Sequence, residues 1–407
     1  MAAQPAADGP WLAIVGIGED GVEGLSPAAR KLVSGAEIVF GGQRHLALAD
    51  AIITGARRPW PSPFAIDAVL ARRGEKVCVL ASGDPFVHGI GALLAREVPP
   101  SEMTVMPAPS AFSLAAARLG WPLPEVTMLA LHARAPDLLR PHLHPGARIL
   151  ALVADGTAAA EIAALLAGAG FGGSRVTALE ALGGPRERIR SVRADTFDLA
   201  GIDPLNLVAI EVAADADACI IPRAPGLPDD AFAHDGQITK REVRALTLSA
   251  LAPVPGELLW DIGAGSGSVV IEWMLAHPSL RAIAIESKAK RAERIRLNAR
   301  NLGVPDLAVV VGSAPAALAQ LAPPDAVFVG GGASDPGVLD AAIAALRPGG
   351  RMVVNGVTLE TEALLLARHA DLGGELTRIA IQRAAPIGTM TAFRPAMPVT
   401  QWRWVRP

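Results

Sequence analysis

Short apolar runs recur along the chain, separated by mixed segments in which apolar residues return at helical spacing. Such runs are typical of strands buried on both faces, and the segments between them favour helices. One helix is expected to begin after Ser26, a good N-cap, with Pro27 at its first position. In this half we also expect a helix over 157–169, and strands over 11–16, 36–40, 76–80, 127–131, 148–153, 176–179 and 207–210. The alternation predicts the α/β fold class.

The second half continues the alternation after a Pro- and Asp-containing stretch at 213–230. Here we expect helices over 241–251 and 269–276, and strands over 280–285, 308–311, 326–329 and 352–355. A chain of 407 residues is comfortable for two domains, and neither half repeats the other. We therefore predict a disordered N-terminal tail over 1–9, a first domain over 10–213, a linker over 214–228 and a second domain over 229–407.

The strongest local motif is the run LWDIGAGSGS at 259–268. An apolar strand ends in an acid and a glycine-rich turn, and a helix follows. Such glycines let the backbone turn sharply and approach a ligand closely, and the helix N-terminus offers unpaired N–H groups. A second acid, Glu286, ends the next strand about twenty residues later, where a carboxylate meets ribose hydroxyls. The predicted cofactor residues are Asp261, Gly263, Ala264, Gly265, Ser266, Gly267 and Glu286.

This motif is compatible with two different nucleotide cofactors. Hydride-transfer enzymes use a similar turn, usually with the spacing GxGxxG. Here the glycines follow an acid as GxGxG, which favours S-adenosylmethionine (SAM) over NAD. The basic run that starts at Lys288 resembles a nucleic-acid patch, but a solvated helix face is the better interpretation, because no aromatic residues interleave it.

The composition indicates which binding partners and which cellular compartment can be expected. The formal net charge of −3 gives no global basic field for nucleic acid or membrane. Cys78 and Cys219 are isolated, so we expect neither a disulfide nor a metal site, and a reducing compartment. No signal peptide and no apolar run of about eighteen residues is visible in the sequence. We expect a cytoplasmic protein with no metal, no membrane and no nucleic-acid partner.

Longer segments carry a resemblance to known families. The C-terminal module, 229–404, resembles the precorrin C15-methyltransferase/C12-decarboxylase family in the segments DGQITKREVRAL, LLWDIGAGSGSVVIEW, PDAVFVGGG, LRPGGRMVVNGVTLETEALL and RPAMPVTQW. The N-terminal module, 10–213, resembles the tetrapyrrole methylase superfamily (class III), in particular its C5-methyltransferases, in VGIGEDG, FGGQRHL, ASGDPFVHGIG, PSAFSLAAARLGWP and PLNLVAIEV. Their fused order is similar to the family of bifunctional precorrin-6Y C5,15-methyltransferases (decarboxylating).

The resemblance implies a two-lobed tetrapyrrole methylase fold followed by a Rossmann-like class I SAM methyltransferase fold. It implies methylation of precorrin-6B at C5 by the first domain. The second domain would methylate C15 and decarboxylate the C12 acetate, giving precorrin-8 in cobalamin biosynthesis. One SAM per domain, a small tetrapyrrole substrate and a homo-oligomer are expected. Three alternatives stay open: a cobalt-precorrin substrate, an RNA or protein methyltransferase, and a SAM-binding scaffold without catalysis.

Further site residues follow from the resemblance. In the first domain it implies a SAM cleft between two lobes lined by Gly16, Gly18, Gly83, Asp84, Ser110 and Ala111, with Arg44 and His45 toward the acceptor's carboxylates. In the second domain it implies a cofactor contact from Thr239, and Ser313 and Ala314 stand where the adenine edge is usually met. At the strand ends that face the ligand crevice, Gly331 and Gly332 are the substrate candidates. The catalytic candidates there are Asn355, Thr358 and Glu360. Asp84 is the catalytic candidate of the first domain. His45, His88 and His132 are, taken singly, more often structural or surface residues than acid–base groups.

This sequence departs from the superfamily's pattern at two places. Glu19 stands where the first loop commonly carries proline, and His132-Ala133 stands where the second lobe often has His-Gly. Neither departure removes a candidate catalytic group.

Overall fold

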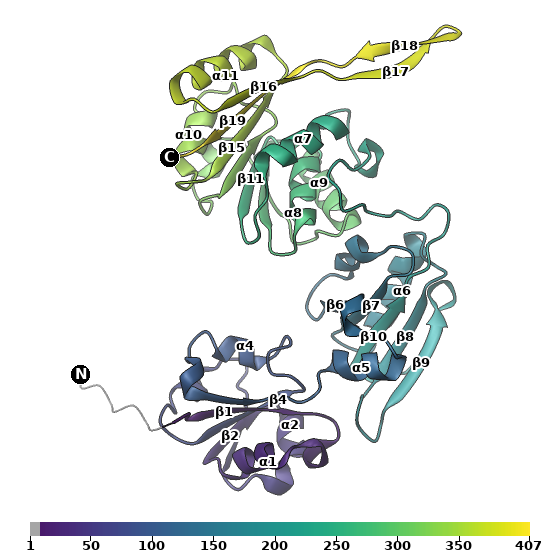
Figure 1. Cartoon of the computed structure of the whole chain (residues 1–407), viewed down its shortest axis with the longest axis vertical. Helices are drawn as coiled ribbons and strands as arrows, with labels where there is room; N and C mark the ends of the chain where they lie inside the picture. The colour runs from purple at the N-terminus through teal and green to yellow at the C-terminus, as the bar shows by residue number, and fades with distance from the viewer. Residues whose placement is uncertain (1–8) are drawn as a thin grey trace, which may run out of the picture. The chain divides into compact units, whose positions relative to one another are not determined.

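The structure is a computed structural model that describes residues 9–407 (Figure 1). It divides into two compact units. Unit 1 runs to Pro136 and includes His144–Cys219, and unit 2 contains Asp137–Leu143 and Ile220–Pro407. The predicted disordered tail, 1–9, lies outside the described residues except for Gly9.

Unit 1 contains two lobes, each built on a five-stranded sheet. The first sheet has the order β3-β2-β4-β1-β5, and all its pairs are parallel. Its strands are β1 (Leu12–Ile17), β2 (Ile38–Gly41), β3 (Ala56–Pro59), β4 (Val77–Ser82) and β5 (Met103–Met106). The helices of this lobe are α1 (Pro27–Ser34), α2 (Gln43–Leu48), α3 (Asp67–Leu70) and α4 (Ile90–Leu94).

The second lobe has the strand order β6-β7-β10-β8-β9, in which only β6 and β7 pair in parallel. Its strands are β6 (Val126–Ala130), β7 (Arg148–Leu152), β8 (Arg175–Glu180), β9 (Arg188–Arg193) and β10 (Asn206–Glu211). Helix α5 (Ala111–Leu119) packs Phe112 and Ala115 into the core of this lobe, and α6 (Ala158–Gly168) belongs to the same lobe. The two-lobed arrangement predicted for the N-terminal half is confirmed.

Unit 2 is built on a seven-stranded sheet with the order β13-β12-β11-β14-β15-β19-β16. The first five strands in this order are parallel, and β19 runs antiparallel to both of its neighbours. The strands are β11 (Leu258–Ile262), β12 (Arg281–Glu286), β13 (Ala308–Val311), β14 (Ala326–Val329), β15 (Arg351–Gly356), β16 (Glu375–Ile379) and β19 (Val399–Val405). The helices are α7 (Arg241–Leu251), α8 (Ser268–Ala276), α9 (Ala289–Asn301), α10 (Val338–Ala345) and α11 (Leu359–Leu372). The Rossmann-like fold predicted for this half is confirmed.

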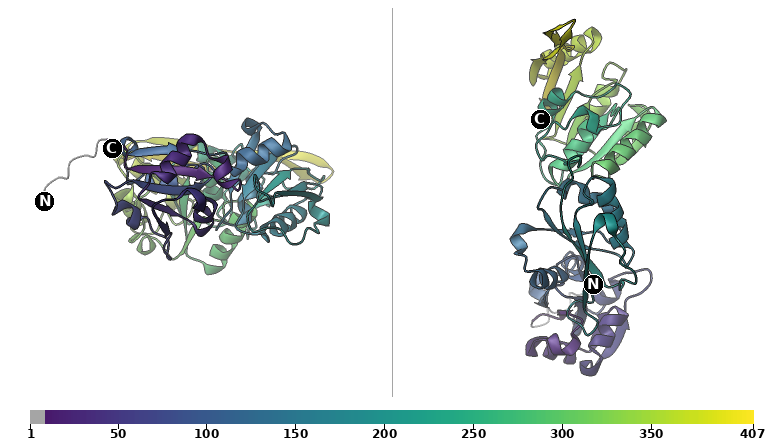
Figure 2. Two further views of the ribbon diagram at one scale, coloured as in Figure 1. Left: turned by 90° about the horizontal axis from the view of Figure 1, so that it is seen from below. Right: turned by 90° about the vertical axis from the view of Figure 1, so that its right-hand side faces the viewer.

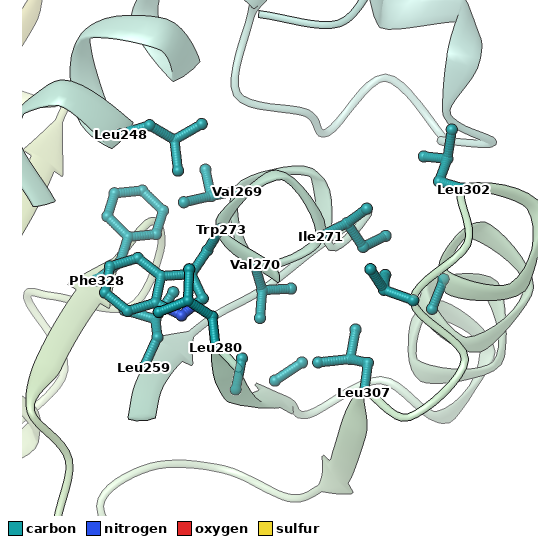
Figure 3. Close-up of a cluster of buried hydrophobic side chains, with 14 of the residues drawn as sticks. Leu248, Leu259, Val269, Val270, Ile271, Trp273, Leu280, Leu302, Leu307 and Phe328 are labelled. Atoms are coloured by element: carbon teal, nitrogen blue, oxygen red, sulfur yellow. The ribbon is translucent and has the colours of Figure 1, made fainter. Parts of the chain in front are cut away.

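Helices cover both faces of the unit 2 sheet (Figures 1 and 2). Successive residues of a strand point to opposite faces, and β11 sends Leu259 to one core and Trp260 to the other. Leu259 packs in a cluster with Trp273 and Phe328 (Figure 3), whereas Trp260 lies in the cluster that holds Trp402. Since β11 is packed on both faces, its carboxyl end is held firmly in position.

Some elements were not predicted. Strand β3 reads Ala-Arg-Arg-Pro with all four residues exposed, so it has no apolar signal. Strands β17 (Gln382–Ile387) and β18 (Met390–Pro395) pair only with each other, forming a hairpin that extends from unit 2 (Figure 1). Most of their residues are also exposed. Within residues 9–407, no helix combines the length and apolarity needed to cross a bilayer.

Candidate functional site

A cavity of about 700 Å³ opens at the carboxyl ends of the parallel strands of unit 2. This is the edge of a Rossmann-like sheet at which ligands bind. Most of the residues predicted for this half line it together: Thr239, Asp261, Gly263, Ala264, Gly265, Ser266, Glu286, Ser313, Ala314, Gly331, Gly332 and Asn355. Gly267, Thr358 and Glu360 are absent from the lining.

The glycine-rich turn after β11 requires glycine on conformational grounds. Gly263, Gly265 and Gly267 have φ of +72°, +60° and +76°, values that side chains rarely adopt. At Gly263 a Cβ would also lie 2.6 Å from the carbonyl oxygen of Gly331. Gly267 is the N-cap of α8, where a Cβ would lie 2.9 Å from Ile295. The first glycine therefore shapes the cavity wall, and the third allows α8 and α9 to pack closely.

Glu286 holds this turn through its carboxylate. The Gly265 amide donates to Oε2 and the Lys288 amide donates to Oε1, each at 2.9 Å. The side chain is 4% exposed and lines the cavity. Each carboxylate oxygen has a further lone pair, so Glu286 can accept from a ligand hydroxyl while it fixes the turn.

Two buried polar groups beside the turn form no hydrogen bond of standard geometry among the described residues, although the Val270 amide lies near enough to one of them to lower its pKa. They are the Asp261 carboxylate and the Ser266 hydroxyl, each on a side chain about 1% exposed. Burial raises the pKa of Asp261 to about 7; the Val270 amide opposes this rise, and the negative charge of Glu286 contributes to it. Unpaired buried acceptors are costly unless a ligand satisfies them. A cationic group with N–H donors, such as the ammonium of a methionine moiety, fits this pair.

Several charged residues bind the segment before α7 and fix its position. Arg291 donates to Asp235 at 2.9 Å, and Arg294 lies 3.1 Å from the same carboxylate, so the pKa of Asp235 is well below its usual range. Arg244 is fully buried and donates to the backbone oxygen of Thr239. These contacts hold Thr239 at the cavity. The roles of these arginines were not predicted, since no local pattern shows which acceptors the fold brings to them.

Two further buried side chains complete that anchoring. Asn298 donates to the carbonyls of Ala233 and Ser266, at 3.0 and 2.8 Å, and thereby joins the segment to the glycine turn. Glu272 accepts from Arg244 at 2.6 Å and neutralises it. Neither residue was predicted to take part in the site.

Asn355 lines the cavity, and both the nitrogen and the oxygen of its side-chain amide form hydrogen bonds. Its Nδ2 donates to Thr247 at 2.9 Å, and its Oδ1 accepts from Gln401 at 2.9 Å. Thr358 is the N-cap of α11 and accepts from the Thr361 amide. Glu360 is an exposed residue in the first turn of α11. The structure therefore groups Asn355 with the cavity, and Thr358 and Glu360 with the start of the helix.

The outer part of the cavity contains residues that were not predicted. Lys240 and Arg383 contribute cationic groups, and Glu242 pairs with Arg383. Ile381 and Met397, at the base of the β17–β18 hairpin, add apolar surface. Lys240 belongs to the GQITK run and could have been chosen from it. This outer part offers both cationic and apolar contacts to a ligand larger than the cofactor.

In unit 1 the carboxyl ends of β1, β4 and β5 meet closely. A Cβ on Gly16 would lie 1.8 Å from the carbonyl oxygen of Gly83 and 2.6 Å from the amide of Ala108. Gly83 has φ of +53°, and a Cβ there would lie 2.7 Å from the Pro109 oxygen. Ser110 follows as the N-cap of α5. The structure thus brings Gly16, Gly83, Ser110 and, at the start of α5, Ala111 to one place.

Two other predicted residues lie in the loops around this place. Asp84 accepts the amide of Phe86 at 2.8 Å, which tightens the loop after β4. Gly18 lies against the Asp20 side chain, with a hypothetical Cβ 2.7 Å from its Oδ1. In the conformation described, Asp84 therefore orders its own loop.

Arg44 and His45 form a polar cluster with Ser82 at the end of β4. The Ser82 hydroxyl is 3.0 Å from Arg44 and 2.8 Å from His45 Nε2. Burial, with a further contribution from Arg44, lowers the pKa of His45 to about 4, so its ring is neutral near pH 7. Glu19 pairs with Arg44 and lies 3.6 Å from Arg186 of the second lobe. Arg44 is therefore the cation here, and His45 is a neutral hydrogen-bonding group.

In the part of the chain that the structure describes, no group of three or more His, Cys, Asp or Glu is placed to hold a metal ion. Cys78 is buried, and its burial raises the pKa of the thiol to about 12. Cys219 is exposed, and both thiols are free.

Comparison with known proteins matches both halves to family models. Residues 12–198 match the tetrapyrrole (corrin/porphyrin) methylases, and residues 230–406 match the precorrin methyltransferase domain. The C-terminal domain of a precorrin-6Y C5,15-methyltransferase from Rhodobacter capsulatus is 52% identical, with a TM-score of 0.44, and covers 46% of this chain and 100% of its own.

Two relatives match over nearly the whole chain, and both are named precorrin-6Y C(5,15)-methyltransferase (decarboxylating). The protein from Sinorhizobium sp is 57% identical over 405 residues, which is 99% of this chain and 98% of the relative. The protein from Mycobacterium tuberculosis (strain CDC 1551 / Oshkosh) is 41% identical over 394 residues, or 96% of this chain and 98% of the relative. The chain therefore belongs to the precorrin-6Y C(5,15)-methyltransferase (decarboxylating) family of SAM-dependent methyltransferases.

Proposed function

We propose that this chain methylates a precorrin-6B-type tetrapyrrole at C5 and C15 and decarboxylates its C12 acetate, giving precorrin-8 for cobalamin biosynthesis. The C5 transfer is assigned to residues 10–213, and the C15 transfer with decarboxylation to residues 229–407, each with its own SAM. The observation that carries the proposal is the unpaired Asp261 and Ser266 beside the turn that Glu286 fixes. This combination suits a ligand with a cationic end and a ribose.

SAM supplies a methyl group on a sulfonium, and the residues around it bind, orient and exclude water. In the second domain Asp261 and Ser266 would hold the methionine ammonium, and Glu286 the ribose. Thr239, Ser313 and Ala314 are the proposed contacts for the rest of the cofactor. Methyl transfer is an in-line displacement, so holding both partners in alignment accounts for most of what the protein must do.

On the substrate side we propose Gly331, Gly332 and Asn355 at the strand ends, with Thr358 and Glu360 as further candidates on α11. Lys240 and Arg383 offer charge complementarity to the carboxylates of a tetrapyrrole. When the acetate loses CO2, the C–C bonding electrons pass into the conjugated macrocycle. The substrate is thus its own electron sink, and the proposal requires no metal or covalent nucleophile.

In the first domain the second SAM is assigned to Gly16, Gly18, Gly83, Asp84, Ser110 and Ala111. The close approach of the loops at Gly16, Gly83 and Ser110 supports one shared ligand site at the ends of β1, β4 and β5. Arg44 would meet a substrate carboxylate, with His45 as a neutral hydrogen-bonding neighbour. The catalytic candidate remains Asp84. Homo-oligomerisation, the absence of a nucleic-acid partner and a cytoplasmic location also remain predictions.

The test is mass spectrometry of products formed by the full chain from precorrin-6B and SAM. We expect two added methyl groups and the loss of one CO2. Glu286→Gln should reduce C15 methylation and CO2 release while C5 methylation continues, and Gly83→Ala should do the reverse. A parallel reaction with the cobalt-loaded substrate distinguishes the two routes. Only one methyl addition by the wild-type chain, without CO2 release, would contradict the bifunctional assignment.

A further inference from the structure

Two histidine rings from different lobes of unit 1 lie close together. His88 is in the loop between β4 and α4, and His132 follows β6. Their ring centroids are 6.5 Å apart, and the rings are nearly perpendicular, at 83°. Both residues are exposed, so an incoming molecule can reach the imidazoles. Each histidine alone suggested a structural or surface role, but the pair was not visible in the sequence.

Strained backbone lies at both sides of this histidine pair. His88 has φ of +55°, and Ala133, directly after His132, has φ of +58°. Among the described residues, these are two of the four non-glycine positions with positive φ. A left-handed conformation is unfavourable for residues with a Cβ, and such strain gathers at sites where geometry serves function. Two separate loops therefore adopt unfavourable backbone conformations at the place where they present the two rings.

The pair lies next to the residues proposed to hold SAM in the first domain. His88 belongs to the same loop as Gly83 and Asp84. Its ring also meets Phe112 edge-on, with centroids 6.3 Å apart, and Phe112 directly follows Ser110 and Ala111. His88 thus belongs to one loop of the proposed cofactor site, the loop after β4, and its ring contacts the start of α5, which forms the other side of that site.

The surroundings of His132 favour the neutral form of its ring. Partial burial, with a further contribution from His88, lowers the pKa of His132, because two imidazolium ions at this distance repel each other. Asp84, the acid in the His88 loop, has its carboxylate engaged by the Phe86 amide. Arg134, the next charged residue after His132, adds positive charge to that loop. A neutral imidazole near pH 7 can accept a proton.

Methylation of a meso carbon releases a proton that must be taken up. The carbon forms a bond to the methyl group while the bond between methyl and sulfur breaks, and that electron pair stays on sulfur. The C–H bond at the same carbon then breaks, its electron pair returns to the conjugated macrocycle, and the proton leaves. Resting on the proposed C5 assignment, we propose that the His88–His132 pair is the proton acceptor of the first domain.

The test compares His88→Gln, His132→Gln and the double variant in the full chain, with precorrin-6B and SAM as the probes. The C5 rate of the double variant should fall by about 100-fold or more, the range found for a lost general base. At least one single variant should account for most of that loss. C15 methylation and CO2 release by the same molecules should stay unchanged, and His144→Gln is the matched control for unit 1.

The pH profile distinguishes a base from a structural role. For the wild type, the C5 rate should fall as acid protonates the pair, and this acid limb should disappear from the residual rate of the double variant. A C5 rate within threefold of wild type in the double variant would overturn the inference. An equal loss with an unchanged acid limb would also overturn it. If Gly83→Ala leaves C5 methylation intact, the domain assignment itself fails, which is a separate result.

Discussion

Replacing Gly263 by alanine tests whether the glycine turn shapes the cavity of unit 2. Gly263 has φ of +72°, and a Cβ there would lie 2.6 Å from the oxygen and 3.0 Å from the carbon of the Gly331 carbonyl. Both contacts are to backbone, so no side chain can rotate away. Gly349→Ala is the matched control, because Gly349 has φ of +76° and no atom within 4 Å of its hypothetical Cβ. The two variants share the conformational strain and differ in the contact.

The expected magnitudes follow from this difference. A left-handed alanine costs roughly 1–2 kcal/mol, and this applies to both variants. At Gly263 the added overlap forces the ends of β11 and β14 apart, at a further cost of about 1–3 kcal/mol. Gly331 lines the cavity, so the displaced backbone also disturbs ligand binding. We expect Gly263→Ala to weaken SAM binding about 10- to 100-fold, since each 1.4 kcal/mol corresponds to a factor of ten.

Calorimetric titration with SAM measures the affinity, and hydrogen exchange at β11 and β14 measures the opening of unit 2 separately from unit 1. Gly349→Ala should show the smaller loss of protection and an unchanged affinity at the second-domain site. Equal losses of affinity in the two variants would refute the reasoning, because the backbone contact would then have no effect of its own.

Three further predictions concern residues of the same unit. Burial raises the pKa of Asp261 to about 7 from 3.8. The folded protein therefore keeps a proton that the unfolded chain releases, and the free energy of unfolding should fall as pH rises between those values. Denaturant titrations at pH 5 and 7.5 measure this change, and Asp261→Asn should abolish it. If the free energy of unfolding of the variant still falls between these pH values, other groups cause the change. Glu286→Gln should weaken SAM binding about 10- to 100-fold by calorimetry, as expected for hydrogen bonds to a charged group; unchanged binding would exclude a ribose contact. Arg244→Met leaves Glu272 buried without its cation and should lower the free energy of unfolding of unit 2 by about 3–5 kcal/mol, and protection of α7 and α8 from hydrogen exchange close to wild type would contradict this.

The parts of the site that could be predicted are those whose geometry is local in sequence. The strand, turn and helix around Asp261 follow one another directly, and Glu286 comes at the end of the next strand. Parallel strands bring such ends to one edge of the sheet. The sheet and its positions at the cavity therefore followed from apolar runs and glycine spacing.

The residues that hold those loops in place could not be predicted, because at least one partner of each is distant along the chain. Arg244 joins Thr239 to Glu272, and Gln401 donates to Asn355 from 46 residues away. A buried arginine or glutamine has no sequence pattern of its own, and only the fold shows which acceptors surround it. The β17–β18 hairpin was missed for a different reason, since it buries too little apolar surface to produce an alternating pattern.

The glycines of the two units have different physical functions, which explains why only one set forms a visible motif. In unit 2 the chain itself needs positive φ at Gly263 and Gly265, so the glycines must follow one another at fixed spacing. In unit 1 Gly16 has no positive φ, and only packing between strand ends requires it: a Cβ there would lie 1.8 Å from the carbonyl oxygen of Gly83, which is far away in sequence. Such a requirement places single glycines at the ends of separate strands and leaves their spacing free. A search for spaced glycines therefore finds the glycine turn of unit 2 directly, while the corresponding place in unit 1 becomes visible only when β1, β4 and β5 are seen side by side.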